Sequence, residues 1–173
     1  MRWETRNVIF GLVILIALLP LLFVRSSKAF GVNAPKQPVD FFHRVHAGDK
    51  QIACQYCHAQ TTQSSFAGMP ATQLCIRCHR VIIPNHPEIK KLKAFWEKGE
   101  GVPWERVNRL PGFVYFTHKA HISAGVPCET CHGDMRKMDR ARQATPMNMG
   151  WCVTCHRTNK YKKAPTDCVV CHR

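Results

Sequence analysis

The strongest constraint in this sequence is a five-residue motif, C-x-x-C-H, which occurs five times. All 10 cysteines of the chain belong to these motifs, so none remains for a structural disulfide. The motif residues are Cys54, Cys57 and His58; Cys75, Cys78 and His79; Cys128, Cys131 and His132; Cys152, Cys155 and His156; and Cys168, Cys171 and His172.

This motif is the signature of covalent c-type haem attachment. Its cysteines form thioether bonds to the haem vinyl groups, and its histidine is placed to bind the iron from the proximal side. Zinc ribbons and thioredoxin-like proteins also use C-x-x-C units. Zinc ribbons need the pairs in even number, no βαβ pattern surrounds these motifs, and neither class needs a histidine after every pair. The sequence therefore predicts five covalently bound c-type haems.

Five haems in a chain of 173 residues also constrain the fold. The porphyrins would supply most of the apolar interior, so the polypeptide can be rich in loops. We expect a mainly α fold with much loop. It would consist of an N-terminal transmembrane helix and a compact multihaem cytochrome c domain with little or no sheet.

The chain is strongly basic, with 25 Lys and Arg against 11 Asp and Glu. Such an excess is typical of nucleic-acid-binding proteins. Each haem carries two propionates, however, so five haems would add about ten carboxylates that cancel much of this charge. The basic residues are also spread through the haem region. We interpret them as propionate partners and solvated surface, with a docking face for an acidic protein as the second interpretation, and we predict no nucleic-acid partner.

Residues 1–28 contain an uninterrupted apolar run from Val8 to Val24. At about 1.5 Å per residue the run is slightly short for a bilayer core, but tilt and flanking residues can make up the difference. A cleaved signal peptide is the alternative, although no A-x-A-like cleavage site follows. We expect a membrane anchor. Because c-type haem is attached outside the cytoplasmic membrane in bacteria, we expect a single-pass protein of the bacterial inner (cytoplasmic) membrane with its C-terminal haem domain on the periplasmic side.

The remaining chain divides by its motifs into a linker at 29–38, a dihaem module at 39–80, a helical connector at 81–112 and a trihaem module at 113–173. The connector predicts a helix over 85–101, since Pro87 suits the first helical position and apolar residues recur at helical spacing after it. A second short apolar stripe comprises Trp104, Val107 and Leu110.

Both modules begin with the pattern F-x-H-x-x-H, six or seven residues before a C-x-x-C-H motif. This internal repeat indicates a duplicated unit. We interpret its aromatic residue, Phe41 or Phe116, as packing against a porphyrin face. Two histidines three residues apart share one turn and can serve two neighbouring haems. The four predicted distal iron ligands are His43, His46, His118 and His121.

The trihaem module has only one such pair, so it lacks one local distal ligand. Met149, just before the fourth motif, lies within reach of a nearby haem, and its thioether would raise the reduction potential. Core packing is the plainer interpretation of this methionine. We predict Met149 as the fifth distal ligand, with His86 as the alternative and an open position last. His86 stands between two prolines at a helix start, which is typical of a capping or surface residue.

Several longer segments carry a resemblance to a known family: FFHRVH with CQYCH, SSFAGMPATQLCIRCH, WERVNRLPGFVYFTHKAH and MGWCVTCHR. They resemble the pentahaem cytochrome c subunit of alternative complex III, a bacterial quinol:electron-acceptor oxidoreductase, over nearly the whole chain. The haem modules are also similar to class III cytochromes of the c7 and c3 type.

This resemblance implies an electron-transfer subunit of an oxidoreductase complex that is not an enzyme by itself. It would receive electrons from an iron–sulfur subunit, linked to a polytopic membrane subunit, and pass them to a monohaem cytochrome or a terminal oxidase. One alternative is a self-sufficient anchored quinol dehydrogenase that feeds a periplasmic reductase, but no dedicated quinol-pocket residues stand between Ser26 and Asp40. A catalytic multihaem reductase, which needs an open iron position, is the other.

Overall fold

The computed structural model describes residues 34–158, 161 and 164–172, all of which belong to one structural unit, residues 33–173. The predicted anchor at 1–28 lies outside the described residues. Among the helices of the described ranges, none is long and apolar enough to cross a membrane.

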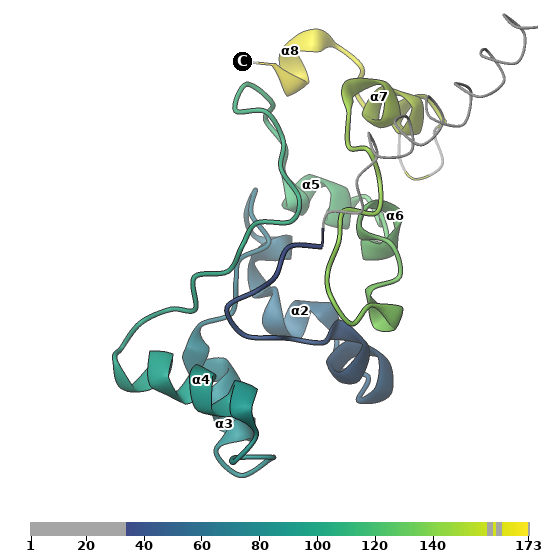
Figure 1. Ribbon diagram of the computed structural model, residues 1–173. Coiled ribbons are helices and arrows are strands. Elements are labelled where there is room, and N and C mark those ends of the chain that lie inside the picture. Colours follow the sequence, from purple (N-terminus) through teal and green to yellow (C-terminus); the bar gives the residue numbers. More distant parts are fainter. Residues whose placement is uncertain (1–33, 159–160, 162–163, 173) are drawn as a thin grey trace, which may run out of the picture. The chain divides into compact units, whose positions relative to one another are not determined.

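The regular structure of the described residues is entirely helical, in short segments joined by loops (Figure 1). The prediction of a mainly helical domain without sheet is therefore confirmed for this part of the chain. In chain order the elements are the π-helix η1 (Arg44–Asp49), α2 (Cys54–Cys57), the 3-10 helix η2 (Ala59–Thr62), α3 (Thr72–His79), α4 (Pro87–Glu97), α5 (His118–Ser123), α6 (Cys128–His132), the 3-10 helix η3 (Met135–Lys137), α7 (Met149–Arg157) and α8 (Cys168–Cys171).

Each C-x-x-C-H motif coincides with one of the helices α2, α3, α6, α7 and α8. Residues three apart share a face of a helical turn, so the local fold puts the two thiols of a motif on the same side. All five begin directly after a residue in extended conformation, and α2, α6 and α8 begin at the first cysteine of the motif itself. Each motif thus forms a single turn that presents both thiols together.

The predicted connector helix is present as α4, shorter than expected at both ends. Pro87 is its first residue, and Gly99, in the left-handed region at φ 71°, follows its C-terminus. A helix of this length is only marginal alone and depends on tertiary packing. Ile89 and Leu92 supply that packing, since both are buried and α4 lies against α3.

Residues 100–111 have no regular structure, although the apolar residues in them recur at helical spacing. Pro103 and Pro111 restrict this segment. Its backbone is held by the linker instead: the Gln37 side chain donates to the Glu105 carbonyl at 3.1 Å and accepts from the Glu105 N–H at 2.9 Å. The apolar stripe of this segment therefore does not form a second connector helix.

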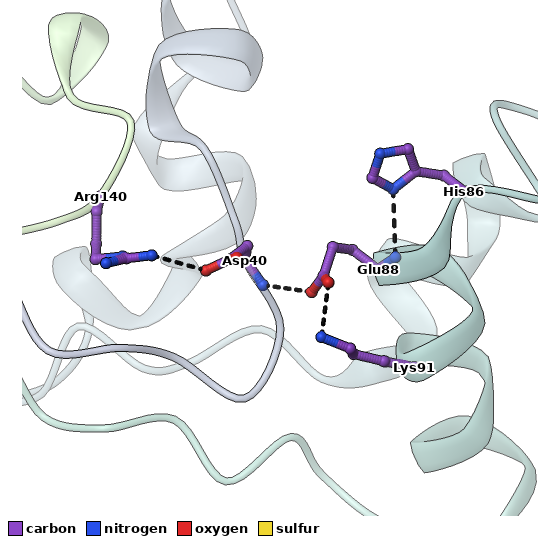
Figure 2. Close-up of polar contacts among 5 residues, drawn as sticks. All are labelled: Asp40, His86, Glu88, Lys91 and Arg140. Carbon is purple, nitrogen blue, oxygen red and sulfur yellow. Dashed lines mark hydrogen bonds and ion pairs between the residues drawn. The ribbon is translucent and has the colours of Figure 1, made fainter.

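Polar contacts around Asp40 tie the dihaem module to the connector and to the trihaem module (Figure 2). The Asp40 N–H donates to the Glu88 carboxylate at 2.8 Å, and the Asp40 carboxylate accepts from Arg140 at 3.1 Å. Glu88 also accepts from Lys91 at 2.7 Å. Exposed ion pairs of this kind contribute about 0–1 kcal/mol each, so they fix the positions of the modules more than they stabilise the unit.

Protein atoms alone bury few apolar side chains in the described residues. The buried ones are Val39, Ile89, Leu92 and Met138, whereas large side chains such as Phe66 and Val81 are about 70% exposed. A domain of about 150 residues normally buries close to 70% of the surface of its unfolded chain. The described part of the polypeptide therefore lacks the apolar core that a domain of this length usually builds from side chains.

Candidate haem-binding sites

Histidines of the two H-x-x-H pairs lie opposite histidines of the C-x-x-C-H motifs. The paired rings come from different helices, and their centres are about equally far apart in every case. The pairs are His46 with His79 at 5.9 Å, His118 with His132 at 6.3 Å and His121 with His156 at 6.0 Å.

These separations fit one metal ion between each pair of rings. A metal–imidazole bond is about 2 Å long and the ring centre lies about 1 Å behind the nitrogen, so two imidazoles on one metal have centres about 6 Å apart. The rings of His118 and His132 are also nearly parallel, with 9° between their planes. The spacing of the three pairs therefore fits two imidazoles that would bind one iron between them.

His43 lies near the histidine of the first motif, His58, close enough for the two imidazoles to interact electrostatically. Burial, followed by the imidazoles of His58, His46 and His132, lowers the pKa of His43 to about 4. His43 is therefore neutral at neutral pH, which is the form that binds metal. His58 is the neighbouring imidazole with the strongest effect on it. His43 and His58 thus form the fourth pair of neighbouring imidazoles.

Backbone carbonyls set the tautomer of six of these histidine rings, that is, which ring nitrogen carries the proton. A carbonyl oxygen can only accept, so the facing Nδ1 carries the proton and Nε2 keeps its lone pair for a metal. The contacts are His46 to Phe42 O at 3.0 Å, His58 to Gly68 O at 2.8 Å, His79 to Ile82 O at 3.2 Å, His118 to Ser65 O at 2.8 Å, His121 to Thr117 O at 2.8 Å and His156 to Pro165 O at 2.6 Å.

The repeated phenylalanine has the same environment in both modules. Phe41 stacks on His46 with ring centres 4.3 Å apart and meets His43 edge-on at 4.9 Å. Phe116 stacks on the second histidine of its own pair at 4.6 Å and meets the first edge-on at 4.8 Å. We expected these residues against a porphyrin face. Their contacts in the described residues are with the histidine rings of their own motifs, which they hold at a fixed angle to each other.

The thiols of different motifs lie close enough to act on one another. Burial and then Cys54, of the first motif, raise the pKa of the Cys128 thiol in the third. Burial, followed by Cys155 and Cys152 of the fourth motif, raises the pKa of Cys131 to about 11. The third motif is therefore adjacent to both the first and the fourth.

The two remaining motifs continue this series at its ends. Burial and then Cys57 raise the pKa of Cys75 in the second motif, and burial and then Cys171, in the fifth, raise the pKa of Cys152. The motifs thus follow one another in space as second, first, third, fourth and fifth. Figure 1 shows the corresponding helices in this succession, α3, α2, α6, α7 and α8.

The fifth motif differs from the other four. In the part of the chain that the structure describes, the ring next to His172 is Phe113, with centres 5.8 Å apart, and not a second histidine. Met149 begins α7 and is 66% exposed. His86 caps α4, which packs on α3, and its Nδ1 accepts from the Glu88 N–H at 3.3 Å. The distal ligand of the fifth site stays a prediction.

Sequence reasoning did not find Asn108. Its side-chain amide lies 3.2 Å from Nδ1 of His132, the one proximal histidine of the trihaem module with a side-chain partner at that atom in the described residues. Asn108 stands 24 positions before His132, and a single asparagine in an irregular segment belongs to no pattern that would predict the contact.

The donors present are those that a c-type haem requires: two thiols on one turn and an adjacent imidazole, with a second imidazole opposite in three cases and nearby in a fourth. The exposed apolar side chains also suit a domain that packs around porphyrins. Together, the fold and these sites define a multihaem c-type cytochrome.

Comparisons with known proteins agree with this class. The family described as cytochrome c7 and related cytochrome c matches residues 114–173. The multihaem cytochrome c subunit of menaquinone reductase from Nitratidesulfovibrio vulgaris (strain Hildenborough) is 30% identical over 162 residues, which cover 80% of this chain and 77% of that protein. The chain therefore belongs to the family of multihaem cytochromes c that includes this subunit.

Proposed function

We propose that this chain is an electron-transfer subunit of a quinol-oxidising respiratory complex of the alternative complex III type, and that it relays electrons through five covalently bound haems. The observation that carries the proposal is the opposition of three C-x-x-C-H histidines to three further imidazoles at about 6 Å between ring centres, with His43 beside His58 as a fourth neighbouring pair. An iron bound by two imidazoles has no position left for a substrate, so such a site exchanges electrons and nothing else.

Four pairs of the proposed iron ligands are the neighbouring imidazoles, and the fifth pair is the one predicted from the sequence. The proximal ligands are His58, His79, His132, His156 and His172, and their distal partners in the same order are His43, His46, His118, His121 and Met149. Haem supplies the one-electron chemistry when bound. The cysteines and histidines of this chain would position the haems, backbone carbonyls hold six of the histidines in the metal-binding tautomer, and paired imidazoles on one iron would exclude water from it.

The succession of motifs supports a linear route for electrons. Its two ends are the second motif on α3 and the fifth motif on α8, so we propose that donor and acceptor proteins contact these two ends. The fifth site, with its predicted thioether ligand, would have the highest potential and would suit the acceptor end.

The partners are proposed from relatives. The named relative is a subunit of a menaquinone reductase, and the segments around WERVNRLPG resemble alternative complex III. We propose an iron–sulfur subunit as donor, a polytopic membrane subunit as the site of quinol chemistry, and a monohaem cytochrome or a terminal oxidase as acceptor. The relative's name describes quinone reduction, which is the reverse direction, and the haem potentials relative to the quinone pool set the direction. The anchor at 1–28 would keep the haem domain at the periplasmic surface.

The test uses the full chain and its complex. We expect five haems per chain by pyridine haemochrome assay, low-spin spectra for at least four of them, and oxidation of a quinol analogue by the complex but not by the isolated chain. Quinol oxidation by the chain alone at the rate of the complex would instead support the self-sufficient dehydrogenase. A high-spin haem with substrate-dependent turnover would support a reductase.

The fifth ligand has its own test. Replacing Met149 with Leu should remove one high-potential component from a potentiometric titration, because a thioether ligand raises the potential of its haem. His86→Ala is the matched control, since His86 caps α4 and its loss should leave the titration unchanged. If Met149→Leu leaves every component in place, Met149 is not the ligand.

A further inference from the structure

Asn108 contacts the proximal histidine of the central motif through its side chain. The amide nitrogen as drawn lies 3.2 Å from Nδ1 of His132, and the amide oxygen is buried without a hydrogen-bond partner. In this orientation the N–H donates to Nδ1. The ring would then carry its own proton on Nε2, where it could not bind iron.

We propose that the amide has the opposite orientation and that Asn108 is the positioning residue of His132. The oxygen and nitrogen of an amide have nearly the same shape, so their assignment follows from the hydrogen bonds that they make. With Oδ1 toward the ring, Oδ1 accepts the Nδ1 proton of His132 and Nε2 is free. The rotation moves the amide NH₂ to the buried position without a protein partner, so the number of unpartnered atoms does not change. What improves is the tautomer of His132, whose Nε2 becomes free to bind a metal.

Asn108 differs in kind from the partners of the other proximal rings. His58, His79 and His156 face backbone carbonyls, which every amino-acid sequence supplies. His132 instead faces a side chain, so a single substitution can change its partner. Its motif is the middle one of the spatial succession, between the first and the fourth.

An acceptor at Nδ1 has two effects on an iron-bound imidazole. It fixes the plane of the ring, and it increases the basicity of Nε2, which favours the oxidised iron and lowers the reduction potential. The first effect agrees with the near-parallel rings of His118 and His132. We therefore infer that Asn108 lowers the potential of the central haem. This inference rests on the proposed role of His132 as an iron ligand.

The experiment compares Asn108→Leu, which removes the acceptor, with Asn108→Asp, which keeps the shape and strengthens the acceptor by a charge. In the full haem-loaded chain, resolved potentiometric titration should show one component shifted upward for Asn108→Leu, by about tenfold in its one-electron equilibrium. This equals about 59 mV. Asn108→Asp should shift the same component downward. Asn85→Leu, at an exposed asparagine of the connector, is the matched control and should shift none.

Each outcome decides the question. Opposite shifts of one component in the two variants support the inference. Five haems per chain with no shift in either variant, or with equal shifts in the same direction, would overturn the inference while leaving the proposed function intact. A wild-type chain with fewer than five haems would overturn the proposed function and the inference together. If Asn108→Leu does not fold, the downward shift of the isosteric Asn108→Asp still decides.

Discussion

Removal of one distal histidine should open one haem and no other. His118 lies 6.3 Å from His132 in ring centres, while its neighbour His121 lies 6.0 Å from His156. Each histidine of the pair thus faces a different motif. In His118→Ala the iron at His132 would lose its sixth ligand, and the iron at His156 would keep both.

The expected change in haem absorbance and in carbon monoxide binding follows from the fact that each histidine faces a different motif. With five haems in the chain, one opened site converts about one fifth of the haem absorbance to a high-spin form and binds about one carbon monoxide per chain. The assay is a carbon monoxide titration of the reduced, haem-loaded protein, followed by difference spectra. The wild-type protein, with its histidine pairs closed, should show no such binding at these four sites.

The control is the neighbouring variant. His121→Ala should also bind about one carbon monoxide, and the double variant should bind about two, because the two histidines belong to separate sites and their effects should add. If His118→Ala opens two sites, or if the double variant opens no more than a single one, the proposed pairing of rings is refuted.

Three further predictions concern stability. Phe116→Leu removes two aromatic contacts with the neighbouring histidine pair, each worth about 0.5–1.5 kcal/mol. The free energy of unfolding in chemical denaturation should therefore fall by about 1–3 kcal/mol. Phe41→Leu should cause the same loss, because Phe41 makes the same two contacts. Gly133→Ala should cost about 1–3 kcal/mol in the same assay, since φ 70° and ψ 179° suit glycine alone, and an unchanged midpoint would contradict this. Glu88→Gln should lower Tm at neutral pH but not in acid. The hydrogen bond from Lys91, followed by that from the Asp40 N–H, lowers the pKa of Glu88 below its usual value of 4.5. The ionised Glu88 carboxylate therefore stabilises the fold above that pH, and this stabilisation is lost as the pH falls through the folded-state pKa. A Tm difference that persists in strong acid would contradict this.

The sequence predicted the chemistry of the sites better than their arrangement. The C-x-x-C-H motifs and the H-x-x-H pairs are local, so spacing alone identifies them and places each on one turn. Helix α4 was predictable for the same reason, because Pro87 and Gly99 mark its ends. The segment 100–111 was not, since its conformation depends on Gln37, which is 68 positions from Glu105.

The sequence does not predict which histidine rings face each other. Nothing in the spacing says that His46 faces His79, or that the carbonyl of Ser65 orients His118 from 53 positions away. Such contacts depend on how loops return, and a backbone carbonyl leaves no mark in the sequence. Asn108 is a side chain, but its role appears only once its segment has been placed beside His132.

The two histidines of an H-x-x-H pair keep a fixed spacing even where loops elsewhere in the chain differ in length. His118 and His121 share one turn of α5, so at about 1.5 Å of rise per residue they are offset by about 4.5 Å along the helix axis whatever the loops do. Insertions or deletions in the loops would leave this offset between the two histidines unchanged.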